Sequence, residues 1–186
     1  MLEINLLSTQ IAAGWLLILS GLIFLPGGLL FTSRVIWKRT AAKNPVYLYW
    51  ERGFVIAAVV VVVLGWGLLE RLLETVGDSI LAPSGLIILI LSTGLVLAAE
   101  LYNLSKQEWL QALIVVHVVL AFLAQAVFGA SLLQTGLLPG WVGWATIIWS
   151  LGLLVYLPAF KPRDIYYPWV HYVAPLMIGI GLLVKV

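Results

Sequence analysis

The sequence contains no cysteine, and only 10% of its 186 residues are charged. Without cysteine the chain has no disulfides, thiolate metal ligands, iron–sulfur clusters or cysteine nucleophiles. Soluble domains carry charge on about 25% of their residues, so ten basic and eight acidic side chains are too few to cover a surface in water. They also form no basic patch of the kind that binds nucleic acid. Because 63% of the residues are hydrophobic, we expect the chain to be surrounded by a lipid bilayer.

Six apolar stretches are long enough to cross the hydrocarbon core, which takes about 20 helical residues. They are residues 11–32, 53–73, 81–101, 109–133, 141–160 and 169–186. Lipid offers no partner to the backbone of an open strand, and the runs are continuous rather than alternating, which excludes a barrel. The sequence therefore predicts an all-α transmembrane bundle of about six helices, with residues 1–186 forming a single domain.

Basic residues gather at one end of the predicted spans. The links after the first, third and fifth spans hold eight of the ten lysines and arginines: Arg34, Lys38, Arg39, Lys43, Arg52, Lys106, Lys161 and Arg163. Arg71 and Lys185 lie at the other end. Because basic loops remain in the cytoplasm, the sequence predicts a multi-pass protein of a prokaryotic-type cytoplasmic membrane, with both termini outside.

The two histidines of the chain fall in predicted spans, His117 in the fourth and His171 in the sixth. Imidazole ligates haem iron, so one hypothesis is a b-type haem held by both histidines between these helices. At 1.5 Å per residue, however, His117 lies about 8 Å deeper than His171. The alternative, which this offset favours, is that His117 forms hydrogen bonds within the bundle while His171 belongs to an interfacial aromatic belt.

Polar residues near the histidines predict a ligand pocket. Polar side chains within a span face the bundle interior, and Glu100, Gln111, Gln125 and Tyr172 are the residues that we expect to line this pocket. The alternative is that Glu100, like Glu51 at the start of the second span, reaches water at the membrane interface. Their positions near span ends favour this second interpretation.

Small residues share a helical face with each histidine. The fourth span has His117, Ala121, Ala124, Gln125 and Gly129 on one face, and the sixth has His171, Ala174, Pro175 and Gly179. Small residues let helices approach closely, so both faces are predicted to point inward. Pro26, Gly27 and Gly28 are a point at which the first span could break, but no broken pair of helices typical of transporters is predicted.

No catalytic or metal site is predicted. Ser131 lies towards the outer end of the fourth span and both histidines towards the inner ends, so a Ser–His nucleophile is not expected. No group of histidine, aspartate and glutamate residues has the spacing of a metal site.

The stretch Gln125–Leu153 resembles a family of prokaryotic six-helix membrane proteins known only as a domain of unknown function. The resemblance rests on the turn Gly136-Leu137-Leu138-Pro139-x-Trp141-x-Gly143-Trp144, which joins the fourth and fifth spans. It implies a fold of six helices and no activity, so no functional residue is carried over.

The leading hypothesis for function is non-enzymatic. The bundle binds an apolar ligand between its helices, or it serves as a subunit beside another membrane protein or a further copy of itself. The alternatives are a small-molecule transporter and the haem protein that uses His117 and His171; no cofactor other than this haem is expected.

Overall fold

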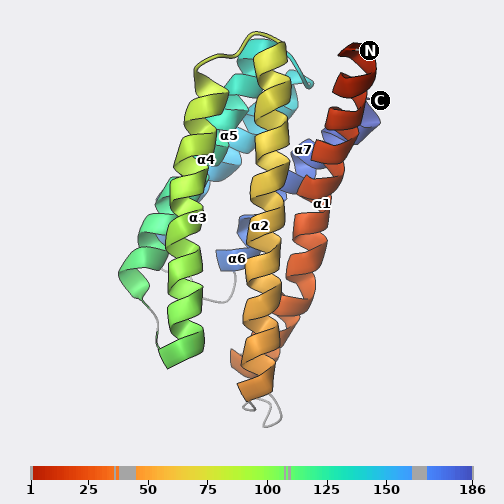
Figure 1. The fold of residues 1–186 in the computed structure, drawn as a ribbon. Helices are drawn as coiled ribbons and strands as arrows, with labels where there is room; N and C mark the ends of the chain where they lie inside the picture. Colours follow the sequence, from red (N-terminus) through yellow and green to blue (C-terminus); the bar gives the residue numbers. More distant parts are fainter. Residues whose placement is uncertain are drawn as a thin grey trace.

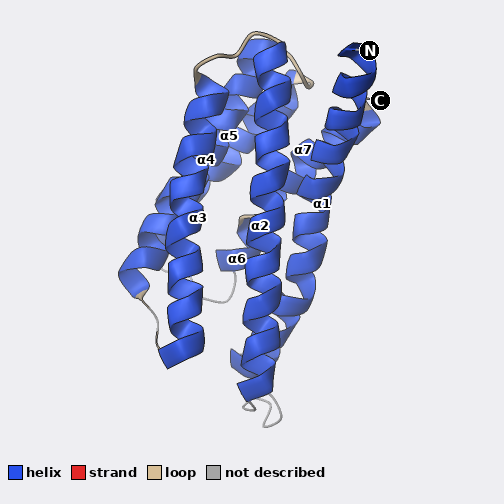
Figure 2. Cartoon of the chain, viewed as in Figure 1, coloured by secondary structure: helices blue, strands red, loops and turns tan. Residues whose placement is uncertain are grey.

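The computed structural model describes residues 2–35, 37, 45–106, 108, 110–160 and 167–185. Its helices are α1 (Leu2–Val35), α2 (Pro45–Thr75), α3 (Leu81–Lys106), α4 (Gln111–Thr135), α5 (Gly140–Phe160), α6 (Tyr167–Val170) and α7 (Val173–Val184). Figure 2 shows helices and no strand in this part of the chain. The expectation of an all-helical chain is confirmed, and the physical reason is that a helix satisfies its own backbone groups in lipid.

The sixth predicted span is not one continuous helix. In the described residues, α1 to α5 are each long and apolar enough to cross a membrane. In contrast, α7 has 12 residues, or about 18 Å of helix, against about 30 Å of hydrocarbon. A turn at His171 and Tyr172 separates it from α6. The expectation of an unbroken helix over residues 169–186 is wrong, because Pro175 has no N–H for the His171 carbonyl and its ring crowds that oxygen.

The first helix, by contrast, continues through Pro26. The break that the sequence allowed there does not occur, and the two following glycines have another role. A Cβ on Gly27 would lie 3.0 Å from the Cβ of Phe54, and one on Gly28 would meet the ring of Trp169. These glycines therefore let α2 and α6 approach α1 closely.

Figure 1 shows both chain ends at the same end of the bundle. The helix α1 packs against α2 and α7, α3 packs against α4, and α4 packs against α5. The largest buried cluster is centred on Trp66 and Phe128, whose ring centroids lie 4.5 Å apart. Its members come mainly from the half of the bundle that carries the chain ends, so this half is solidly packed.

The small-residue faces do point inward, as predicted. Ala121, Ala124 and Ala174 are buried, and a Cβ on Gly129 would lie 2.9 Å from the carbonyl oxygen of Gly143 on α5. The small face of α4 therefore serves packing within the chain, where it allows close contact of two helix backbones.

Candidate ligand-binding cavity

A cavity of about 780 Å³ lies between the helices, in the half of the bundle away from the chain ends. Residues from α1 to α6 line it, together with the turn that precedes α7. Its volume is typical of pockets that bind small molecules. The walls are largely apolar, and the polar side chains are concentrated in two groups, one ionic and one around the histidines.

The ionic group consists of two arginines and two glutamates from three helices. Arg34 on α1 donates to both carboxylate oxygens of Glu51 on α2, each at 2.8 Å. Arg52 on α2 donates to both carboxylate oxygens of Glu100 on α3, at 3.2 and 3.0 Å, and also forms an ion pair with Glu51. Opposite charges thus alternate along the group and join α1, α2 and α3.

Three of these four charges are buried: the exposed fraction is 1% for Glu51, 3% for Arg52 and 4% for Glu100. The interpretation that Glu51 and Glu100 reach water is therefore wrong. A buried charge needs a partner, and removing one member of such a pair costs about 3–5 kcal/mol. Sequence reasoning treated Arg34 only as a loop charge. The signal that it missed is that two arginines and two glutamates lie near the ends of three successive helices that meet at this end of the bundle.

The second polar group contains both histidines. The ring centroids of His117 and His171 lie 5.3 Å apart, and the His171 ring also stacks on Phe122 at 4.3 Å. The predicted offset in depth therefore does not separate them. His171 lies inside the bundle and lines the cavity, so its assignment to the interfacial belt is wrong.

The predicted hydrogen bonding of His117 within the bundle is confirmed. Its Nδ1 lies 3.1 Å from the carbonyl oxygen of Ser92 on α3. A carbonyl only accepts, so Nδ1 carries the hydrogen and Nε2 keeps its lone pair. The Ser92 hydroxyl, 2.8 Å from Nδ1, donates to the backbone oxygen of His117 at 2.9 Å.

This Ser92–His117 contact is structural rather than nucleophilic. A serine nucleophile must give its proton to the histidine and face the substrate. Ser92 is completely buried and does not line the cavity, and its hydroxyl hydrogen is used by the His117 carbonyl. The pair fixes α3 against α4 and holds the His117 ring in place.

The relative orientation of the two rings bears on the haem hypothesis. Their planes are inclined by 27°, so the rings are stacked. The lone pairs of imidazole lie in the ring plane, and two axial ligands must point them at one iron from opposite sides. At least one ring would have to turn before both histidines could ligate the same iron.

The break between α6 and α7 lies beside the histidines and is held by side chains from other helices. The Gln125 amide donates to the His171 carbonyl at 3.1 Å, and this is the carbonyl that Pro175 leaves without a helical partner. The Trp149 indole donates to the Val170 carbonyl at 3.0 Å. Two carbonyl oxygens at the break that lack a partner in their own helix therefore accept hydrogen bonds from side chains of the bundle, as an apolar environment requires.

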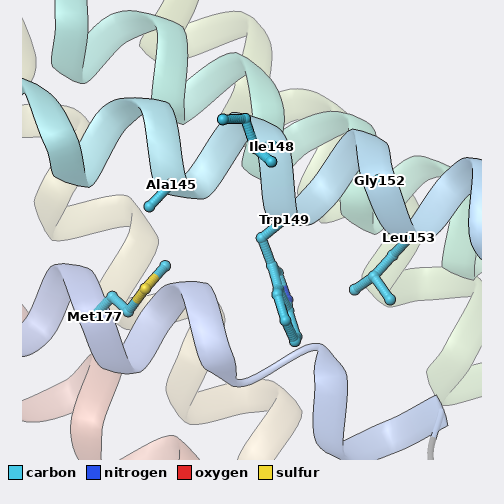
Figure 3. A pocket seen from close by; sticks show the side chains of 6 residues that line it. All are labelled: Ala145, Ile148, Trp149, Gly152, Leu153 and Met177. Atoms are coloured by element: carbon cyan, nitrogen blue, oxygen red, sulfur yellow. The ribbon is translucent and has the colours of Figure 1, made fainter.

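A second hollow lies on the other side of α5. This groove, of about 430 Å³, is apolar and is formed by α5 and α7. Figure 3 shows Trp149 reaching from α5 towards the turn between α6 and α7, with Met177 projecting from α7. Trp149 therefore lies against the helix break while it also forms part of the groove wall.

All six predicted site residues line the one cavity: Glu100, Gln111, His117, Gln125, His171 and Tyr172. Gln111 is exposed, and the aromatic ring of Tyr172 stacks on Phe24 at 4.7 Å. Sequence reasoning missed Trp66 and Trp169, because an aromatic residue in an apolar run is usually part of the core.

The chain matches no known family model, curated protein or solved structure. Within the described ranges, no group of three or more histidine, aspartate or glutamate side chains could hold a metal ion.

Proposed function

We propose that this chain is a multi-pass membrane protein that binds a small, mainly apolar molecule in the cavity between its helices. The cavity carries the proposal: it has about 780 Å³ of space, apolar walls and a few polar groups at fixed positions. Ligand sites in bundles have this composition, in which apolar walls supply affinity and a few polar groups supply orientation. The other half of the bundle is filled by the large buried cluster, so the cavity is confined to the half away from the chain ends.

Large cavities are uncommon in protein interiors, which are close-packed. Empty space removes dispersion contacts from every atom around it and lowers stability. In this chain the space is also surrounded by a buried ionic group and a broken helix, both of which are costly arrangements that persist mainly at functional sites. A bound molecule would restore the missing contacts.

The proposed orientation places both termini outside the cytoplasm and the cavity half towards the cytoplasm, in a cytoplasmic membrane of prokaryotic type. It rests on the asymmetry of the basic residues. The described residue Lys106 lies at the cavity end, whereas Lys38, Arg39, Lys43, Lys161 and Arg163 lie outside the described residues. Arg34 and Arg52 are engaged in ion pairs.

Transport is the second function that a specific observation supports. Discontinuous helices beside a central site are a recurring feature of secondary transporters, and the break at His171 and Tyr172 adjoins the cavity. Transport would require the bound molecule to leave on the other side. Flux of the identified ligand into proteoliposomes separates a transporter from a binding protein.

The test of the binding proposal is native mass spectrometry on protein released from its membrane in mild detergent, with two variants of one helix. Val118 lines the cavity, and Val118→Phe fills part of it. The matched control is Val116→Phe, at a half-exposed position that is outside the cavity lining. We expect a retained small-molecule mass on the wild type and on Val116→Phe, and its loss from Val118→Phe.

Two results would contradict the proposal. One is a wild-type protein that carries no small molecule in any gentle preparation. The other is a Val118→Phe variant that retains the mass as well as its control does while melting at the same temperature. A retained mass that matches a protein chain would instead support the alternative of a subunit in a membrane complex.

A further inference from the structure

The charged side chains that line the cavity form ion pairs with one another. Its lining contains Arg34, Arg52, Glu51 and Glu100, and each of them forms an ion pair with a member of opposite sign. Their formal charges sum to zero. A ligand with a charged headgroup would have to compete with these ion pairs, and separating a pair leaves a buried member without its partner. The ionic group therefore disfavours anions and cations alike.

Two uncharged polar atoms of the lining have no hydrogen-bond partner among the described residues. They are the amide oxygen Oε1 of Gln125 and the indole nitrogen Nε1 of Trp66. Both side chains are buried, with exposed fractions of 3% and 1%. Buried polar groups in native proteins are nearly always paired, so an acceptor and a donor at this depth indicate that a partner is supplied from outside the chain.

The structure also fixes how these two atoms are presented. The Gln125 amide must turn its nitrogen towards the His171 carbonyl, to which it donates; the assignment of nitrogen and oxygen follows from that bond. The Trp66 ring is held against Phe128 at 4.5 Å. Neither side chain needs to be ordered when a ligand binds, which lowers the entropic cost of binding.

From this arrangement we infer that the ligand is an uncharged apolar molecule bearing hydroxyl groups, of the alcohol or phenol class. A hydroxyl group donates one hydrogen and accepts with its lone pairs. Hydroxyl groups of a ligand could therefore donate to Oε1 of Gln125 or accept from the N–H of Trp66. This inference rests on the proposed binding function and adds the chemical class of the ligand.

The test uses four probes with the same ten-carbon chain: 1-decanol, decane, decanoate and decylammonium. The protein is reconstituted in detergent-free peptidiscs at pH 8, and the affinity of each probe is obtained from the dependence of the unfolding midpoint on its concentration. We expect 1-decanol to bind about fivefold or more tightly than decane, which corresponds to one or more net neutral hydrogen bonds. Decanoate and decylammonium should bind no more tightly than decane.

Trp66→Phe identifies the donor, because it removes the indole N–H and keeps an aromatic ring. It should reduce the advantage of 1-decanol over decane about fivefold and leave the affinity for decane unchanged. Trp141→Phe is the matched control, since Trp141 is exposed and lies outside the lining. Should Trp66→Phe fail to fold, the ranking of the four probes on the wild type still decides the question.

The outcomes separate the two proposals. If a charged probe binds more tightly than 1-decanol, or if 1-decanol binds no more tightly than decane, the inferred ligand class is wrong while binding in the cavity stands. If Trp66→Phe leaves the preference for 1-decanol intact, Trp66 is not the donor. If no probe stabilises the wild type more than it stabilises Val118→Phe, the cavity is not the binding site and both proposals fail.

Discussion

Asp78 is buried at the end of the bundle opposite the cavity, with an exposed fraction of 1%. Its carboxylate accepts hydrogen bonds from the backbone N–H groups of Ile80, Leu81 and Ala82 at 3.0, 2.8 and 2.9 Å. It also accepts one from the hydroxyl of Ser131 on α4. Asp78 thus caps the start of α3 and connects it to α4, a role that also accounts for Ser131, whose hydroxyl is far from either histidine.

The pKa of Asp78 makes this cap sensitive to acid. Burial raises the pKa, but the hydrogen bonds from Ser131 and the three backbone amides outweigh it, so that the pKa lies below its usual value. A carboxylate with a lowered folded-state pKa contributes stability that is complete above the unfolded-state pKa of about 4. That stability is lost as the pH falls through the lower folded-state value.

We therefore expect Asp78→Asn to lower the free energy of unfolding at neutral pH by about 1–2 kcal/mol, through loss of the charged cap. The unfolding midpoint of this variant should also fall less steeply than that of the wild type below about pH 4. Thermal unfolding in detergent, followed by circular dichroism as a function of pH, measures both effects. Glu74→Gln, at an exposed residue of the same end, is the control. Equal acid sensitivity in the wild type and in Asp78→Asn would mean that the Asp78 carboxylate is not the acid-sensitive cap of α3.

Single residues of the site were predictable when they were exceptions to an apolar run. Gln125 and His117 stand out because a polar group in a span must face the interior, and both line the cavity. Arg34 was not recognised, because the same charge near a span end is also the ordinary sign of a cytoplasmic loop. Which of the two applies depends on contacts between helices, and those are not visible in one sequence.

At the scale of the element, the broken helix is the feature that the sequence predicted least well. Pro175 and Pro26 both lie in apolar stretches, yet α1 continues through Pro26 and the last segment breaks before Pro175. The difference is that Gln125 and Trp149 supply donors to the carbonyls at the second site. A proline weakens a helix locally, and its neighbours in space decide whether the helix breaks.

Close packing of α4 against α5 gives a prediction for two glycines of the same helix. A Cβ on Gly143 would lie 2.8 Å from the carbonyl oxygen of Gly129, whereas one on Gly152 would have nothing within 4 Å. We expect Gly143→Ala to lower the free energy of unfolding by about 1–3 kcal/mol, because a backbone atom must move. Gly152→Ala should be neutral or stabilising by up to about 1 kcal/mol.

Unfolding by sodium dodecyl sulfate in mixed micelles measures this difference, because the fraction of unfolded protein at increasing concentrations of this detergent can be compared between the two variants. Equal midpoints for Gly143→Ala and Gly152→Ala would mean that α4 and α5 are further apart than the structure has them. A loss of stability in Gly152→Ala alone would point to a contact of that face with lipid or a further chain.

For the molecule as a whole, the two ends of the bundle differ in how densely they are packed. The end with the termini contains the large core around Trp66 and Phe128, and the other end contains the cavity and the ionic group. Composition and hydropathy predicted a membrane bundle. The predicted third, fourth and fifth spans agree with α3, α4 and α5 to within five residues, whereas α1 and α2 begin nine and eight residues earlier than predicted. Composition and hydropathy could not predict this asymmetry, because packed and hollow regions are lined by the same apolar residue types.

The absence of cysteine allows the proposed orientation to be tested one residue at a time. Any introduced thiol is the sole thiol of the chain, so a membrane-impermeant maleimide labels it without background. Ser79 and Ser105 are both exposed, one before the start of α3 and one near its end. We expect Ser79→Cys to be labelled in intact cells, and Ser105→Cys to be labelled only after the membrane is permeabilised.

Val184→Cys extends the same test to the broken last segment. Val184 is exposed and ends α7, and the two chain ends lie at one end of the bundle (Figure 1). If α6 and α7 together return the chain across the membrane, Val184→Cys is labelled like Ser79→Cys. If Val184→Cys is instead labelled like Ser105→Cys, the 12 residues of α7 re-enter the bilayer without crossing it. A reversed pattern at Ser79 and Ser105 would mean that the protein has the opposite orientation, with the cavity half outside. The pattern at three positions therefore determines both the orientation and whether the cavity faces the cytoplasm.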